Sequence, residues 1–316
     1  MNDVPWLKDQ VSFLEKKGLN VTVFKIPNFS ILKKVKAIIS LRSLLFKKKF
    51  QIVHAHWGQN SIFAFTTKSP LITTYHGSDL QGDVNENGFV TFKGVVTIFL
   101  SRISTLISNY NIFVSKRLIN SAPKKVINKK NYIIPMGFDS NLFKPKDKQE
   151  AKQKLGLESK IKYILFAGNF SQPVKRFSLA ERVMDELDDK FKLIKLNFAA
   201  HHQMSTYMNA SDVLLMTSYQ EGSPVIIKEA LACNLSVVST DVGDVKEMIK
   251  KVPGSFISKN NKPVMIAKMI RKSVAINSKV SNYNKMLKHS STAMNYKVLS
   301  IYKGIFNRKG CLNGAI

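Results

Sequence analysis

The most constraining feature of this sequence is a repeated alternation of short apolar runs with longer amphipathic stretches. The short runs are rich in Val, Ile and Phe and have the length of strands, whereas the stretches between them place apolar residues at helical spacing. Strand-then-helix alternation along a chain is typical of parallel sheets covered by helices. The sequence therefore predicts an α/β protein.

The predicted elements follow from this pattern. Strands are expected at residues 19–26, 51–55, 71–75, 111–114, 132–134, 162–167, 191–196, 213–216 and 236–239. Helices are expected at residues 7–17, 31–46, 95–107, 178–187, 224–233 and 283–306.

The polar segment 141–160 interrupts the series and contains Pro145, which indicates a connection between domains. We expect two Rossmann-like domains facing across a cleft, at residues 1–142 and 143–290. A helix within residues 291–316 is expected to pack back toward the first domain.

The formal net charge of +28 is the extreme value of the composition. Only 7 of the 49 basic residues are Arg, and Lys is a solvated point charge rather than the planar fork that nucleic-acid readout favours. The sequence has no RNP-type aromatic motif or zinc knuckle, which disfavours a nucleic-acid-binding protein. The charge indicates either attraction to an anionic membrane surface or lysine-biased codon usage, and both interpretations stay open.

Segment 31–49 is the local candidate for membrane contact, because it combines apolar residues at helical spacing with a cluster of cations. The cations are Lys33, Lys34, Lys36, Arg42 and Lys47–Lys49. The alternative is a core-packed helix with a basic solvent face. No segment approaches the roughly 18 apolar residues of a membrane-spanning helix, and the first residues do not resemble a secretory signal. Because Cys233 and Cys311 lack metal-ligand spacing, we expect a cytoplasmic protein without a disulfide or a structural zinc.

The strongest chemical signal is the segment Glu221–Glu229 (EGSPVIIKE), which follows the strand at 213–216. Ser223 is expected to cap a helix whose first position is Pro224. A helix N-terminus beyond the carboxyl end of a parallel strand favours a phosphate, and flanking glutamates suit a ligand with hydroxyls on either side of a diphosphate. For an isolated pair of this spacing, two solvated glutamates are the simpler interpretation.

A second signal is the segment Phe166–Arg176, which follows a strand and precedes a helix. Its loop is expected at the same edge of the sheet. Lys175 stands out by this position and not by its charge, since a solvated surface residue is the default for any of the chain's lysines. A third signal is the segment Thr73–Asp79, in which His76 follows a strand directly. Upstream, His54 and His56 are interpreted as structural, with a metal pair as the alternative.

Residues 209–244 resemble the donor-site signature of family 4 glycosyltransferases, and the whole chain resembles the family more loosely. The resemblance implies a GT-B fold whose second domain binds the nucleotide. It assigns the ribose hydroxyls to Glu229, the transferred sugar to Glu221, and the donor's phosphate or sugar oxygens to the backbone around Gly222 and Ser223.

The same resemblance carries to the other two signals. Lys175 corresponds to the family's lysine that clamps the donor diphosphate, whereas Asn169 replaces the usual arginine and Arg176 is a candidate to complete the clamp. His76 corresponds to the histidine that approaches the donor sugar from the first domain. Asp79 is expected either to orient His76 or to contact the acceptor.

The resemblance implies a retaining glycosyltransferase that uses a UDP- or GDP-linked sugar and a saccharide or lipid-linked acceptor in cell-surface polysaccharide synthesis. We expect no cofactor and no metal, because no D-x-D pair follows a strand, and a location in the cytoplasm or on the inner face of the cell membrane. Family members open with a strand and a glycine-bearing loop before the first helix, so we expect a shortened chain lacking its first strand. The alternatives are a GT-B phosphorylase or epimerase and a donor-binding pseudoenzyme.

Overall fold

The computed structural model describes residues 4–27, 31–128, 130–197, 201–276 and 282–308. The chain forms two compact units. Unit 1 comprises the described parts of residues 1–83, 90–135 and 291–316, and unit 2 comprises 84–89 and the described parts of 136–290. Each unit has its own parallel sheet, as the alternation predicts.

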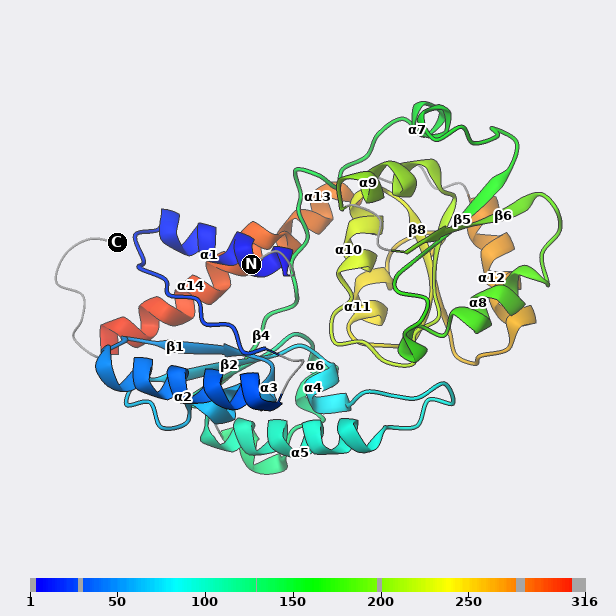
Figure 1. Cartoon of the computed structure of the whole chain (residues 1–316). Helices are drawn as coiled ribbons and strands as arrows, with labels where there is room; N and C mark the ends of the chain where they lie inside the picture. Colours follow the sequence, from blue (N-terminus) through cyan, green and yellow to red (C-terminus); the bar gives the residue numbers. More distant parts are fainter. Residues whose placement is uncertain (1–3, 28–30, 129, 198–200, 277–281, 309–316) are drawn as a thin grey trace. The chain divides into compact units, whose positions relative to one another are not determined.

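Unit 1 is built on four parallel strands in the order β1-β2-β3-β4. The strands are β1 Val53–His56, β2 Leu71–Tyr75, β3 Tyr110–Phe113 and β4 Lys130–Ile133. Figure 1 shows two long helices on one side of this sheet, α1 (Pro5–Lys16) and α14 (Ser291–Arg308). Two others lie on the opposite side, α2 (Ile31–Lys47) and α5 (Phe92–Ile107). Short helical turns complete it: α3 Gly58–Ser61, η1 Ile62–Ala64, α4 Ser78–Gln81, α6 Lys116–Ile119 and η2 Lys124–Asn128.

The expected strand at 19–26 is wrong, because residues 19–27 have no regular secondary structure. Within the described residues β1 pairs with β2 alone, and no strand pairs with residues 19–27. A β-rich composition creates a strand only where a neighbour satisfies its backbone groups, so this segment stays irregular.

Unit 2 is built on five parallel strands in the order β6-β5-β7-β8-β9. The strands are β5 Lys162–Ala167, β6 Phe191–Leu196, β7 Val213–Met216, β8 Ser236–Thr240 and β9 Phe256–Ser258. Alternate residues of β7 enter different cores: Leu214 joins the cluster with α10 and Leu215 the cluster with α8 and α12. The helices are α7 Lys148–Lys154, α8 Phe177–Met184, α9 His201–Ala210, α10 Val225–Ala232, α11 Val245–Ile249, α12 Pro263–Ile276 and α13 Tyr283–Met286, with the turns η3 Pro173–Lys175 and η4 Leu287–His289.

The expected single helix at 283–306 is divided into α13, η4 and α14. Ser290 takes an extended conformation, with φ −65° and ψ 159°, and bridges Phe138 in a parallel pairing. That pairing ends the helical hydrogen bonding where the chain passes from unit 2 to unit 1. Among the helices that the structure describes, none is both long and apolar enough to cross a membrane.

Candidate functional site

In unit 2 two loops meet at one edge of the sheet. The loop 217–224 follows β7, and the loop 168–176 follows its parallel neighbour β5. Parallel strands deliver their carboxyl ends to the same edge, where open α/β sheets bind ligands. The backbone N–H of Tyr219 donates to the carbonyl of Val174 at 2.9 Å, which ties the loops together.

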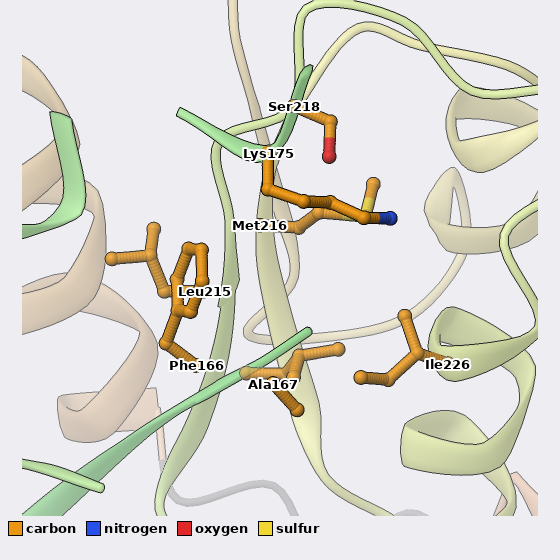
Figure 2. Close-up of a pocket in the computed structure, with 8 residues that line it drawn as sticks. Phe166, Ala167, Lys175, Leu215, Met216, Ser218 and Ile226 are labelled. Carbon is orange, nitrogen blue, oxygen red and sulfur yellow. The ribbon is translucent and has the colours of Figure 1, made fainter. Parts of the chain in front are cut away.

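An ion pair between these loops joins two of the predicted site residues. Lys175 Nζ lies 2.7 Å from Glu221 Oε1, and the two side chains are 27% and 16% exposed. The Ser218 hydroxyl donates to the same carboxylate oxygen at 2.8 Å. Figure 2 shows the Lys175 side chain crossing a small pocket lined by β5, β7 and Ile226 of α10. The arrangement holds an ammonium and a carboxylate side by side at the edge of the sheet.

The cationic loop is held rigidly by Thr217, which sequence reasoning missed. Its hydroxyl contacts the carbonyls of Lys175 and Arg176, at 2.8 and 2.9 Å. Arg176 has a left-handed backbone with φ 50°, and its guanidinium lies 4.2 Å from the centroid of the Tyr219 ring. Arg176 is thus placed on the loop surface beside Lys175, stacked on an aromatic face.

Asn169 has a local role in shaping the loop after β5. Its side-chain oxygen accepts hydrogen bonds from the Ser171 backbone N–H at 3.0 Å and the Ser171 hydroxyl at 2.7 Å. This is an Asx turn. The carboxamide stabilises the turn and supplies no positive charge in place of the family's arginine.

The expected capping of α10 by Ser223 is wrong, since Pro224 occupies the cap position and no side chain caps the helix. The Ser223 hydroxyl instead donates to Asp244 Oδ2 at 2.8 Å. It also accepts from Lys228 Nζ at 2.5 Å and from the Met136 N–H at 3.3 Å. The hydroxyl is thus engaged inside the unit and does not cap the helix.

A buried ion pair lies under this loop. Lys228 Nζ is 3.0 Å from Asp244 Oδ2, and the Lys228 side chain is fully buried. Burial lowers the pKa of Lys228, and the negative charge of Asp244 opposes that effect. Sequence reasoning missed both residues. The signal was a lysine within the run 225–232, which is apolar apart from Lys228 and Glu229, because a buried charge requires a partner.

Gly243 brings the turn after β8 against the same loop. It has φ +53°, and a Cβ there would lie 2.8 Å from the Gly222 carbonyl oxygen and 3.1 Å from that of Glu221. Glu229, one residue beyond Lys228, is also buried at 6% exposure. The loop carrying Glu221–Pro224 therefore rests on α10 and on the Gly243 turn.

In unit 1 the predicted residues His76 and Asp79 follow β2. Asp79 is fully buried, and its carboxylate accepts hydrogen bonds from the backbone N–H groups of Gly58, His76, Gly77 and Leu80. Burial raises the pKa of Asp79, while the backbone donors of Gly77, Gly58 and His76 lower it. A carboxylate enclosed in this way fixes the turn at His76, which favours the orienting role over acceptor contact.

Three histidines adjoin at the ends of β1 and β2. His56 Nδ1 lies 3.1 Å from His76 Nε2, and the His54 and His56 rings stack at 4.4 Å. Burial lowers the pKa of His56 to about 4 and the pKa of His54 and His76 well below the ordinary value. The three imidazoles are therefore neutral near pH 7.

The histidines differ in their surroundings. His54 Nδ1 is 2.6 Å from the Tyr302 hydroxyl and its Nε2 is 2.7 Å from that of Thr74, which is the structural role expected for it. The His76 ring lies against the rings of Trp6 and Trp57, with ring centroids 4.9 Å apart in both cases. In the described part of the chain, no group of three or more His, Cys, Asp or Glu side chains is arranged to hold a metal ion. Cys233 is a buried free thiol, and Cys311 lies outside the described residues.

Two family models match the chain. Residues 178–275 match "Glycosyl transferases group 1", and residues 6–110 match "Glycosyl transferase 4-like". The solved sucrose-phosphate synthase of Thermosynechococcus elongatus superposes with a TM-score of 0.73 at 14% identity, over 90% of this chain and 81% of that one. HepE of Anabaena, solved with UDP and glucose, superposes with a TM-score of 0.68 at 16% identity, over 93% and 89%.

Each half of the chain thus matches a glycosyltransferase model, the chain resembles the family 4-like glycosyltransferases, and it has the GT-B fold. The putative teichuronic acid biosynthesis glycosyltransferase TuaC of Bacillus subtilis is 26% identical over 63% of this chain and 55% of its own length. The N-acetyl-alpha-D-glucosaminyl L-malate synthase of Bacillus anthracis is 23% identical over 65% and 60%. The chain thus spans little more than half the length of these relatives. The UDP-Gal:alpha-D-GlcNAc-diphosphoundecaprenol alpha-1,3-galactosyltransferase of Escherichia coli is 24% identical over 77% and 72%.

Proposed function

We propose that this family 4-like protein transfers a sugar from a nucleotide-sugar donor to a saccharide or lipid-linked acceptor, with retention of the anomeric configuration. The observation that carries the proposal is the Lys175–Glu221 ion pair at the edge of the unit 2 sheet, beside the start of α10. Opposite charges held together at a strand end match the two halves of a nucleotide sugar, which are an anionic diphosphate and a hydroxyl-rich ring.

The proposed chemistry is breakage of the bond between the sugar C1 and the diphosphate oxygen. The electron pair of that bond leaves on the diphosphate, and the acceptor hydroxyl forms the new bond to C1 on the same face while its proton passes to the diphosphate. Lys175, Arg176 and the backbone N–H groups of Gly222 and Ser223 offset the negative charge that develops. Glu221 binds sugar hydroxyls and stabilises the positive charge at C1, and Glu229 binds the ribose.

His76 is proposed to act as a neutral hydrogen-bonding group toward the donor sugar. Its lowered pKa keeps the imidazole uncharged, and the contact with His56 Nδ1 fixes the ring. Asp79 holds the backbone of the same turn. Asp79 is therefore proposed to position His76 and not to contact the sugar acceptor.

We propose a uridine diphosphate donor and a metal-independent reaction. The uridine nucleotide is supported by the UDP-Gal of the Escherichia coli relative's name and by the UDP bound to HepE. The cationic pair Lys175 and Arg176 supports metal independence, since it places fixed positive charge beside the proposed diphosphate site. Relatives named for teichuronic acid and for an undecaprenol-linked sugar support a role in cell-surface polysaccharide synthesis at the cytoplasmic face of the membrane.

A thermal-shift screen with UDP-, GDP- and ADP-linked sugars tests the donor, because a ligand that binds only the folded state raises the unfolding midpoint. We expect stabilisation by a UDP-sugar that persists in EDTA, together with release of UDP when an acceptor extract is added. Stabilisation without UDP release would identify a donor-binding pseudoenzyme. No response to any nucleotide sugar would contradict the proposal.

A further inference from the structure

In helix α5 of unit 1 small and polar residues face the core and large apolar residues face solvent, the reverse of a usual surface helix. Its inward side consists of small or polar residues, among them the buried Gly94, Ser101 and Ser104. Ser104 donates a hydrogen bond to the Gly58 carbonyl, and a Cβ at Gly58 would lie 2.6 Å from Ser101 Cβ. Small residues are needed here because α5 packs closely on α3.

Most apolar residues of α5 face outward, whereas Ile98 and Leu100 are partly buried. Phe92 is 85% exposed, Phe99 63% and Val95 52%. Val96, Ile103, Leu106 and Ile107 continue the exposed row. Single exposed apolar residues are ordinary, but a row along a four-turn helix marks a surface that contacts something apolar.

Helix α2 extends this surface on the same side of the sheet (Figure 1). Both helices pack against η1, and Phe65, just after η1, is exposed beneath the guanidinium of Arg42. α2 adds the exposed side chains of Leu32, Ile39 and Phe46. It carries five basic residues and α5 two, and neither helix has an acidic residue. We call the exposed residues of α2, Phe65 and α5 the α2–α5 face.

We propose that the α2–α5 face docks on an anionic lipid bilayer. The aromatic and aliphatic side chains enter the headgroup region, and the Lys and Arg side chains contact lipid phosphates. A second copy of the chain is a poor occupant, because two such faces would bring only like charges together. The expectation from segment 31–49 therefore extends to a second helix with a larger apolar row.

The inference deepens the proposed function by naming the surface that would bring the protein to a lipid-linked acceptor. The biological purpose of membrane docking rests on the proposed function, but the docking itself does not. Vesicle binding needs no nucleotide sugar, so failure to bind vesicles and failure to transfer sugar are separate results.

Co-sedimentation of the purified chain with phosphatidylglycerol–phosphatidylcholine vesicles tests the proposal. We expect binding at low salt that weakens at about 0.5 M salt and on pure phosphatidylcholine. Phe92→Ser with Phe99→Ser should reduce binding by at least about tenfold, since two large apolar side chains are lost from the bilayer. The matched control is Val264→Ser with Met265→Ser, an exposed apolar pair on α12 of unit 2 that should leave binding unchanged.

A charge pair completes the design. Lys33→Gln with Lys36→Gln should weaken binding to anionic vesicles, whereas Lys262→Gln with Lys268→Gln should not. Absent or salt-insensitive binding, or equal losses in the test and control pairs, would overturn the proposal. A dimer in analytical ultracentrifugation that the Phe92 and Phe99 substitutions dissociate would also overturn it and identify a protein interface.

Discussion

The two units are similar in architecture but handle polar residues in opposite ways. In unit 2 opposite charges are joined in pairs at and beneath the strand-end loops, Lys175 with Glu221 and Lys228 of α10 with Asp244. In unit 1 the strand ends carry histidines that burial keeps neutral, and the apolar groups of α5 face outward. The difference indicates that unit 2 is built to meet a charged ligand, whereas unit 1 offers neutral contacts and an apolar surface.

Lys228→Met should have the largest effect on stability, because it removes one charge of the buried pair in unit 2. Removing one partner leaves Asp244 buried without its cation, which typically costs about 3–5 kcal/mol. Urea unfolding should show this loss, and Lys228→Met with Asp244→Asn should recover much of it because no charge remains. If the network also positions the donor loop, the double variant should still bind UDP more weakly. Wild-type UDP affinity in the stable double variant would restrict Lys228 to a structural role.

The two glutamates should separate binding from turnover. Glu229→Gln should weaken UDP binding by about 1–3 kcal/mol, as loss of a charged acceptor does. Glu221→Gln should lower the turnover number more than the UDP affinity, because its proposed partner is the sugar. Calorimetry and initial rates give the two quantities. Glu181→Gln on α8, a half-exposed acid, is the matched control, and an equal effect of all three changes would refute the division.

Gly243→Ala should displace the donor loop through contact and strain together. The new methyl would meet the Gly222 carbonyl oxygen, and the left-handed backbone adds about 1 kcal/mol. The matched control is Gly156→Ala, which has a similar φ of +64° and no heavy atom within 4 Å of the added Cβ. We expect the Gly243 variant to lose more stability and, unlike the control, UDP affinity. Equal losses would show that strain alone operates at both sites.

Acid should weaken unit 1 through its histidines. The pKa of His56 is about 4 in the folded state against an ordinary 6.5, so between these values the unfolded chain binds the extra proton. Above pH 6.5 the His56 imidazole is largely neutral in both states, and the free energy of unfolding has its full value. As the pH falls toward 4, protonation of the unfolded chain lowers that free energy. At pH 5.5 the loss attributable to His56 is about 1 kcal/mol.

The measurement is the unfolding free energy at pH 7.5 and 5.5 in wild type and His56→Gln. The adjoining groups are His54 and His76, which act in the same direction, and Asp79, whose raised pKa acts in the opposite one. All three are retained in the variant, so the difference reports His56 together with its electrostatic effect on the pKa of His54 and of His76. A pH dependence as steep in His56→Gln as in wild type would contradict the assignment.

Local pattern was a good guide where an element depends on its own residues and on burial on both sides. The strands at 71–75, 162–167, 191–196 and 213–216 have the predicted bounds. For 162–167 and 213–216 the reason is that parallel strands covered on both faces require apolar runs. The position of Glu221 and Lys175 after neighbouring strands was likewise predictable. The alternation of strand and helix alone brings such loops to one edge of a sheet.

The remaining features depend on partners distant in sequence. Residues 19–26 have strand composition but pair with no strand in the described structure. The sequence predicts that the Ser223 hydroxyl caps a helix. In the structure it bonds to Lys228 and Asp244 instead, because charged partners form stronger hydrogen bonds.

For α5 the sequence by itself determined a helix rich in apolar residues, and only the tertiary structure decided which side faces the core. The serine side of α5 packs against Gly58, because no larger side chain fits there. Phe92 and Phe99 therefore lie on the exposed side of the helix. Helical periodicity reports a helix and its faces, whereas the space available beside a neighbouring backbone determines which face turns inward.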